Sequence, residues 1–152
     1  MIPRGGRRAF LLAALPVLTA QAGGDFIEIS PGLGTRPVLI AASQVVRIGR
    51  AEGYTVVDTT AWVQQRTVEP LEAIAQRVAA TGQRLIPLTD LNGQRIYIAA
   101  DRVVLVRESQ ERHAAGARAA IVMVGLRFNT DVAVRETPED VMAALRGAAP
   151  PR

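Results

Sequence analysis

The chain carries the same short pattern twice. Residues 36–46 reappear as residues 94–104, and both segments contain the run Ile-Ala-Ala. Each copy then reaches a second shared landmark, at residues 68–74 in the first copy and 135–141 in the second. Self-similarity of this kind indicates two neighbouring copies of one structural unit. Each copy holds only about 55–65 residues, a length at which a separate core is marginal, so we expect the two copies to pack together.

Turn-forming residues divide each copy into short apolar stretches, which predict five strands per copy. We expect these strands at residues 26–29, 37–41, 45–49, 54–59 and 62–68, and again at 84–89, 95–99, 103–107, 118–124 and 131–135. Asn92 and Gly93 form the strongest hairpin signal, because both residue types accept a positive φ. Asp101 is interpreted as a turn residue. Short turns between successive strands predict antiparallel meanders.

A short helix is expected to close each copy. In the first copy, apolar residues recur at helical spacing from Leu71 to Val78, and Gly82 follows as a helix stop. In the second, Thr137 is placed as an N-cap residue. Glu69 and Glu136 precede the two helices at equivalent positions. We interpret both carboxylates as charges that are favourable at a helix N-terminus, with a paired acidic site as the alternative.

The sequence therefore predicts a β-dominated α+β fold, built as a tandem duplication of a five-stranded antiparallel meander followed by a short helix. The expected division is a signal peptide at 1–22, a first repeat at 23–82, a second repeat at 83–147 and a tail at 148–152. These patterns leave open whether the two repeats form one sheet or two.

The N-terminus has the three-part plan of a secretory signal peptide. A basic start is followed by an apolar run at 9–20, and Ala20 and Ala22 fit the small-x-small pattern of a cleavage site. Twelve residues are too few for a spanning helix. Arg7, Arg8, Phe10 and Leu11 also match the core of a twin-arginine export motif. We expect export to the periplasm, the alternatives being an uncleaved leader or a true start near Asp25.

The second copy resembles the small flagellar FlbD-like family. The likeness rests on the hairpin at Asn92 and Gly93, the run Ile96-Tyr97-Ile98, Asp101 with its following hydrophobic residues, and the stretch at 134–141, which includes Glu136 and Thr137. The first copy matches the family pattern only loosely, and the loop at 108–117 is additional. The resemblance implies a small assembly or regulatory protein without catalytic residues.

Several classes of site lack the residues that they require. The chain has no cysteine, which excludes disulfides, thiolate nucleophiles and cysteine-ligated metals. Its single histidine, His113, lies in a polar loop and is expected to be solvated. Most of the net charge of +4 comes from arginines in the first eight residues, so no basic face for nucleic acid is indicated. We predict no enzyme, cofactor, metal site or small-molecule substrate, and membrane contact only during export.

Strand edges and isolated aromatic residues are the remaining candidates for function. Short antiparallel sheets with free edges invite strand addition from a partner. Trp62 and Tyr97 are possible partner contacts, although a strand tryptophan is more often a core residue. We therefore predict a non-enzymatic exported binding or assembly protein that acts through sheet edges or faces, by self-association or with another protein. The alternative is a cytoplasmic flagellar or phage-type assembly factor.

Overall fold

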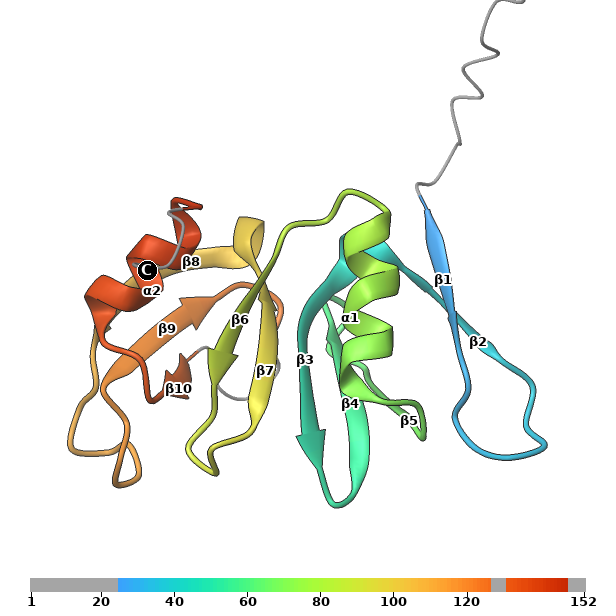
Figure 1. Cartoon of the computed structure of the whole chain (residues 1–152), viewed down its shortest axis with the longest axis horizontal. Coiled ribbons are helices and arrows are strands. Elements are labelled where there is room, and N and C mark those ends of the chain that lie inside the picture. Colours follow the sequence, from blue (N-terminus) through green and yellow to red (C-terminus); the bar gives the residue numbers. More distant parts are fainter. Residues whose placement is uncertain (1–24, 127–130, 148–152) are drawn as a thin grey trace, which may run out of the picture.

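The computed structural model describes residues 25–126 and 131–147 (Figure 1). Within these residues the chain forms ten strands and two α-helices, and all strand pairs are antiparallel. The prediction of a β-dominated α+β fold is confirmed. The predicted export signal, which includes Arg7, Arg8, Phe10, Leu11, Ala20 and Ala22, lies outside the described residues, as does the predicted tail.

The order of elements is the same in the two halves of the chain. The first half contains β1 (Phe26–Ile29), β2 (Val38–Ala41), the 3₁₀-helix η1 (Ala42–Gln44), β3 (Val45–Ala51), β4 (Tyr54–Thr59), β5 (Gln64–Thr67) and α1 (Leu71–Ala80). The second half contains β6 (Leu85–Thr89), β7 (Arg95–Ala99), η2 (Ala100–Arg102), β8 (Val103–Glu108), β9 (Ala119–Met123), β10 (Asp131–Val134) and α2 (Pro138–Leu145). Their common origin by duplication stays a prediction.

Long-range backbone hydrogen bonds also recur at matching positions in the two halves. Each bond in the first half has a counterpart that joins the equivalent segments of the second half. The pairs are Ala42 N to Asp25 O with Ala100 N to Arg84 O, Val68 N to Ser30 O with Arg135 N to Thr89 O, and Thr60 N to Gln44 O with Val124 N to Arg102 O, all between 2.9 and 3.2 Å. The halves therefore share local tertiary contacts as well as an element order, which permits a comparison position by position.

The strands form three sheets, one of which joins the halves. Its order is β5-β4-β3-β7-β6, so that three strands come from the first half and two from the second. The joint is the pair β3–β7, in which Arg47 lies opposite Ile98 and Ile48 opposite Tyr97. The remaining strands form a two-stranded sheet, β1-β2, and a three-stranded sheet, β10-β9-β8. Figure 1 shows these two smaller sheets at opposite ends of the molecule.

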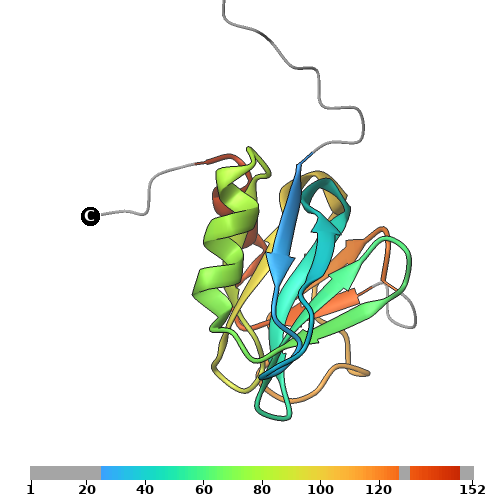
Figure 2. The ribbon, with the colours of Figure 1, turned by 90° about the vertical axis from the view of Figure 1, so that its right-hand side faces the viewer.

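Two apolar cores support this arrangement. The first is built mainly from β1, β2, β3 and α1, and the second from β6, β7, β9, β10 and α2. Figure 2 shows both helices on the same side of the molecule. The stripe predicted for the first helix is confirmed, because its four apolar positions, Leu71, Ile74, Ala75 and Val78, are all buried. Val46 of β3 belongs to the second core, so one side chain of the first half completes the packing of the second.

Local turn chemistry differs from the sequence prediction at three places. Residues 42–44 form the 3₁₀-helix η1 rather than a tight turn. The predicted strand at 62–68 begins only at Gln64, because Trp62 lies in a turn with φ of 64°. Of the hairpin pair, Gly93 alone has a positive φ, of 79°. The turn is held instead by the Asp90 carboxylate, which accepts hydrogen bonds from the backbone N–H groups of Asn92 and Gln94.

Helix capping follows the prediction in the second half. Thr137 is the N-cap of α2, and its hydroxyl oxygen accepts a hydrogen bond of 3.2 Å from the backbone N–H of Asp140. Pro138 then occupies the first turn, where the missing N–H has no helical partner to lose. In α1 the N-cap residue is Pro70, which makes no side-chain cap hydrogen bond. No helix among the described residues is long and apolar enough to cross a membrane.

Candidate functional site

Large apolar side chains are exposed on β2 and β8, each of which is an edge strand of one of the smaller sheets. Leu39 of β2 is 63% exposed, and Val104 of β8 is 58% exposed. Leu105 of β8 and Phe26 of β1 are also exposed. Among the described residues, β2 pairs only with β1 and β8 pairs only with β9, so each has one edge without a strand neighbour there. An exposed apolar strand with an open edge is a natural site for strand addition.

The equivalent strands inside the molecule are covered. β3 corresponds to β8, and it carries the same interruption of register: between Val45 and Arg47 in β3, and between Val103 and Leu105 in β8. The residue at this irregularity is Val46 in β3 and Val104 in β8. Val46 is fully buried because β7 and the second core lie over it, whereas Val104 has no such cover. The exposure of Val104 therefore marks a position that the other half of the chain keeps buried.

β2 and β7 differ in the same way. Tyr97 of β7 corresponds to Leu39 of β2 and is half-buried, packing against the first core across the β3–β7 joint. Tyr97, one of the two predicted partner contacts, thus faces a neighbour that belongs to its own chain. Leu39 was not singled out by the sequence, and it holds the corresponding place on the free strand.

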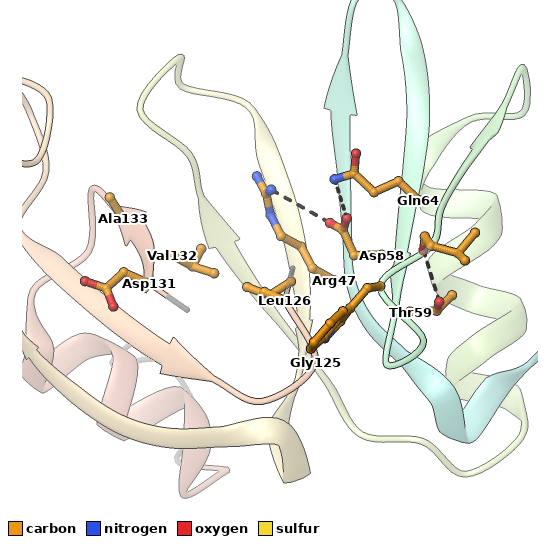
Figure 3. Close-up of a pocket in the computed structure, with 11 residues that line it drawn as sticks. Arg47, Asp58, Thr59, Gln64, Gly125, Leu126, Asp131, Val132 and Ala133 are labelled. Carbon is orange, nitrogen blue, oxygen red and sulfur yellow. Dashed lines mark hydrogen bonds and ion pairs between the residues drawn. The ribbon is translucent and has the colours of Figure 1, made fainter. Parts of the chain in front are cut away.

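Trp62, the other predicted partner contact, is 60% exposed at the rim of a cleft of about 620 Å³. In Figure 3 the cleft has Arg47, Asp58 and Gln64 on one wall and Asp131 with Val132 on the other. Burial raises the pKa of Asp58, against the opposing effects of the Gln64 hydrogen bond of 2.6 Å and the Arg47 charge 3.9 Å away. These groups form a polar wall of the cleft, in which the Arg47 Nε is buried without a hydrogen-bond partner among the described residues.

A second polar cluster corrects the expectation of a solvated histidine. The His113 side chain is 9% exposed. Its Nδ1 accepts a hydrogen bond of 2.8 Å from the Gln110 N–H, and its Nε2 lies 3.3 Å from Asp131. Burial acts to raise the pKa of Asp131, but hydrogen bonds from Arg107, Arg112 and His113 outweigh it and hold that pKa below its ordinary value. This cluster fastens the loop between β8 and β9 to β10.

Glu69 and Glu136 each serve their own half rather than forming a shared acidic site. Glu69 accepts a hydrogen bond of 2.8 Å from the Ser30 N–H and pairs with Arg77, and the Arg77 hydrogen bond is the main reason that its pKa is lowered. Glu136 accepts a bond of 3.0 Å from the Thr89 N–H. Each carboxylate thus ties the start of a helix to the end of the first strand in its half.

The remaining predicted positions lie in turns of the backbone. Asp101 lies in the first turn of η2, and Asn92 and Gly93 lie at the exposed tip of the β6–β7 hairpin. Arg47 lies inside the five-stranded sheet, and Arg102 donates a hydrogen bond to the Ser43 carbonyl across the joint of the two halves. No cluster of metal-ligating side chains occurs in the described part of the chain.

The two free strands emerge as the candidate site. The sequence did contain a signal for them. A residue-by-residue comparison of the two copies shows which apolar positions are repeated, Val46 with Val104 among them, although it does not show which of the two is covered. No family model, curated protein or solved structure matches this chain.

Proposed function

We propose that this chain is a non-enzymatic assembly protein of the bacterial cell envelope, which binds a protein partner through the free edges of β2 and β8. The observation that carries the proposal is the exposure of Leu39 and Val104 on two strands whose counterparts are covered. Placement in the envelope rests on the export signal read from residues 1–22. The alternative is the cytoplasmic flagellar or phage-type assembly factor suggested by the FlbD-like resemblance of the second half.

Site-specific photo-crosslinking in cells tests this function. A benzophenone amino acid at position 39 or 104 is expected to give a light-dependent product of higher mass, because a partner strand would lie within reach of the probe. The matched control is position 33, where Leu33 is 98% exposed but lies in the loop between β1 and β2. We expect no product from this control.

The products also separate the two candidate settings. A crosslinked product in the periplasmic fraction supports the envelope protein, whereas one in the cytoplasm that contains flagellar or virion proteins supports the alternative. If positions 39 and 104 give no more product than position 33 in either compartment, the proposal that these edges bind a protein is wrong.

A further inference from the structure

The strands of the two smaller sheets are the counterparts of the strands that form the five-stranded sheet. The five-stranded sheet consists of a three-stranded meander, β5-β4-β3, joined to a hairpin, β7-β6. The strands left over are the meander β10-β9-β8 and the hairpin β2-β1, which are the counterparts of those two pieces from the opposite halves. Joining them through β8 and β2 would give the order β10-β9-β8-β2-β1, the same order as the existing sheet.

The register of a joint between β8 and β2 can be derived from the register of the β3–β7 joint. Aligning residues 36–46 with 94–104, and continuing without a gap, places Leu39 at the position of Tyr97 and Val106 at that of Ile48. Because Ile48 lies opposite Tyr97 in β3–β7, Val106 would lie opposite Leu39. By the same alignment Leu105 would lie opposite Ile40, as Arg47 lies opposite Ile98.

The exposed side chains are those that this joint would bury. Val46 at the irregularity of β3 is fully buried in the second core, whose members include Ile96 and Ile98 of β7. The counterparts of those two residues are Val38 and Ile40 of β2, so Val104 would pack over them. Leu39 would in turn pack against the second core near Val106, as Tyr97 packs against the first. Burial of each side chain would remove apolar surface that is now in water.

We propose that the partner of these edges is a second copy of this chain, bound head to tail, with β8 of one molecule pairing antiparallel with β2 of the next. This inference rests on the proposed function, since it names the protein that the free edges bind. The two edges lie at opposite ends of the molecule, so one chain does not close the joint on itself (Figure 1). A joint between unlike edges leaves one edge free at each end, and growth then continues until a ring closes or a filament forms.

Two single substitutions, each blocking one edge, test the head-to-tail arrangement. Leu39→Asp places a charge on β2, and Val104→Asp places one on β8. Both replace exposed side chains, so both variants should keep the fold, which circular dichroism checks. Light scattering should find the native chain in assemblies that grow with concentration and each variant as a monomer. An equimolar mixture of the two variants should form a dimer that grows no further, because it retains one intact β8 and one intact β2.

Three results would overturn the proposal. The first is a native chain that stays monomeric up to about 1 mM, the Kd at which binding is worth only about 4 kcal/mol. The second is association of the native chain without rescue in the mixture, and the third is one variant that still forms dimers alone, as a joint between like edges would. A monomeric native chain that crosslinks at position 39 to another protein would refute self-assembly and leave the proposed function standing. Failure of the crosslinks would refute both.

Discussion

Replacing Val46 with aspartate is expected to destabilise the fold by about 3–5 kcal/mol, because it leaves an unpaired charge in the second core. The Val46 side chain is fully buried among residues of the second half, so no water reaches the new carboxylate. In the unassociated chain, the equivalent substitution, Val104→Asp, should change the free energy of unfolding by no more than about 0.5 kcal/mol. The two positions share their place in the repeat, so the difference measures the cover that the β3–β7 joint supplies.

Association must be kept out of this comparison, because a partner that binds the folded chain raises its apparent stability. Val46→Asp is therefore placed in a chain that already carries Val104→Asp, and Val104→Asp alone is the reference. Urea unfolding can be followed by the fluorescence of Trp62, the single tryptophan. Equal stability of the two chains would show that the second core does not depend on Val46.

Gly125→Ala is expected to cost about 2–4 kcal/mol, through crowding and backbone strain together. Gly125 follows β9 and has φ of +94°, a conformation that side chains disfavour. A Cβ there would lie 2.9 Å from Cγ2 of Val46 and 3.2 Å from the backbone Cα of Thr60. The substitution would therefore push the two halves apart where they meet.

The matched control is Gly116→Ala in the loop between β8 and β9. Gly116 has nearly the same φ, of +91°, but a Cβ there would meet nothing within 4 Å. The expected cost of Gly116→Ala is the backbone strain alone, about 1–2 kcal/mol. Thermal unfolding of both variants should give a clearly larger loss for Gly125→Ala. Equal losses would mean that the contact of Gly125 with the first half does not matter for stability.

Local features of this fold could be predicted from the sequence because their causes are local. The stripe from Leu71 to Val78 and the cap at Thr137 depend on residues within one or two helical turns. The order of elements in each half followed from turn residues between apolar stretches. The sequence did not show that Trp62 lies in a turn of positive φ, because the hydrogen bond from its N–H to the Thr59 carbonyl depends on how β4 ends.

Pairing between the halves could not be read from periodicity. Strands β3 and β7 are separated in sequence by β4, β5, α1 and β6, and alternation says which face of a strand is buried but not which edge finds a neighbour. The environment of His113 was also misjudged, since it is set by Asp131 in β10, 18 residues further along the chain. The candidate site needed both sources: the repeat shows which positions are equivalent, and the structure shows that Val46 is covered while Val104 is not.

The most direct test of the central claim, pairing of β8 with β2 of the next molecule, is disulfide formation between two cysteine variants. The chain has no cysteine of its own, so each variant carries a single thiol. Paired residues on antiparallel strands lie about 4.5–5.5 Å apart at Cα, a separation that a disulfide spans. Mixing Leu39→Cys with Val106→Cys under mild oxidation should give a crosslinked dimer, whereas Leu33→Cys with Val106→Cys should not. Crosslinking of Leu39→Cys to itself in preference to Val106→Cys, or no excess over the Leu33→Cys mixture, would contradict the head-to-tail joint.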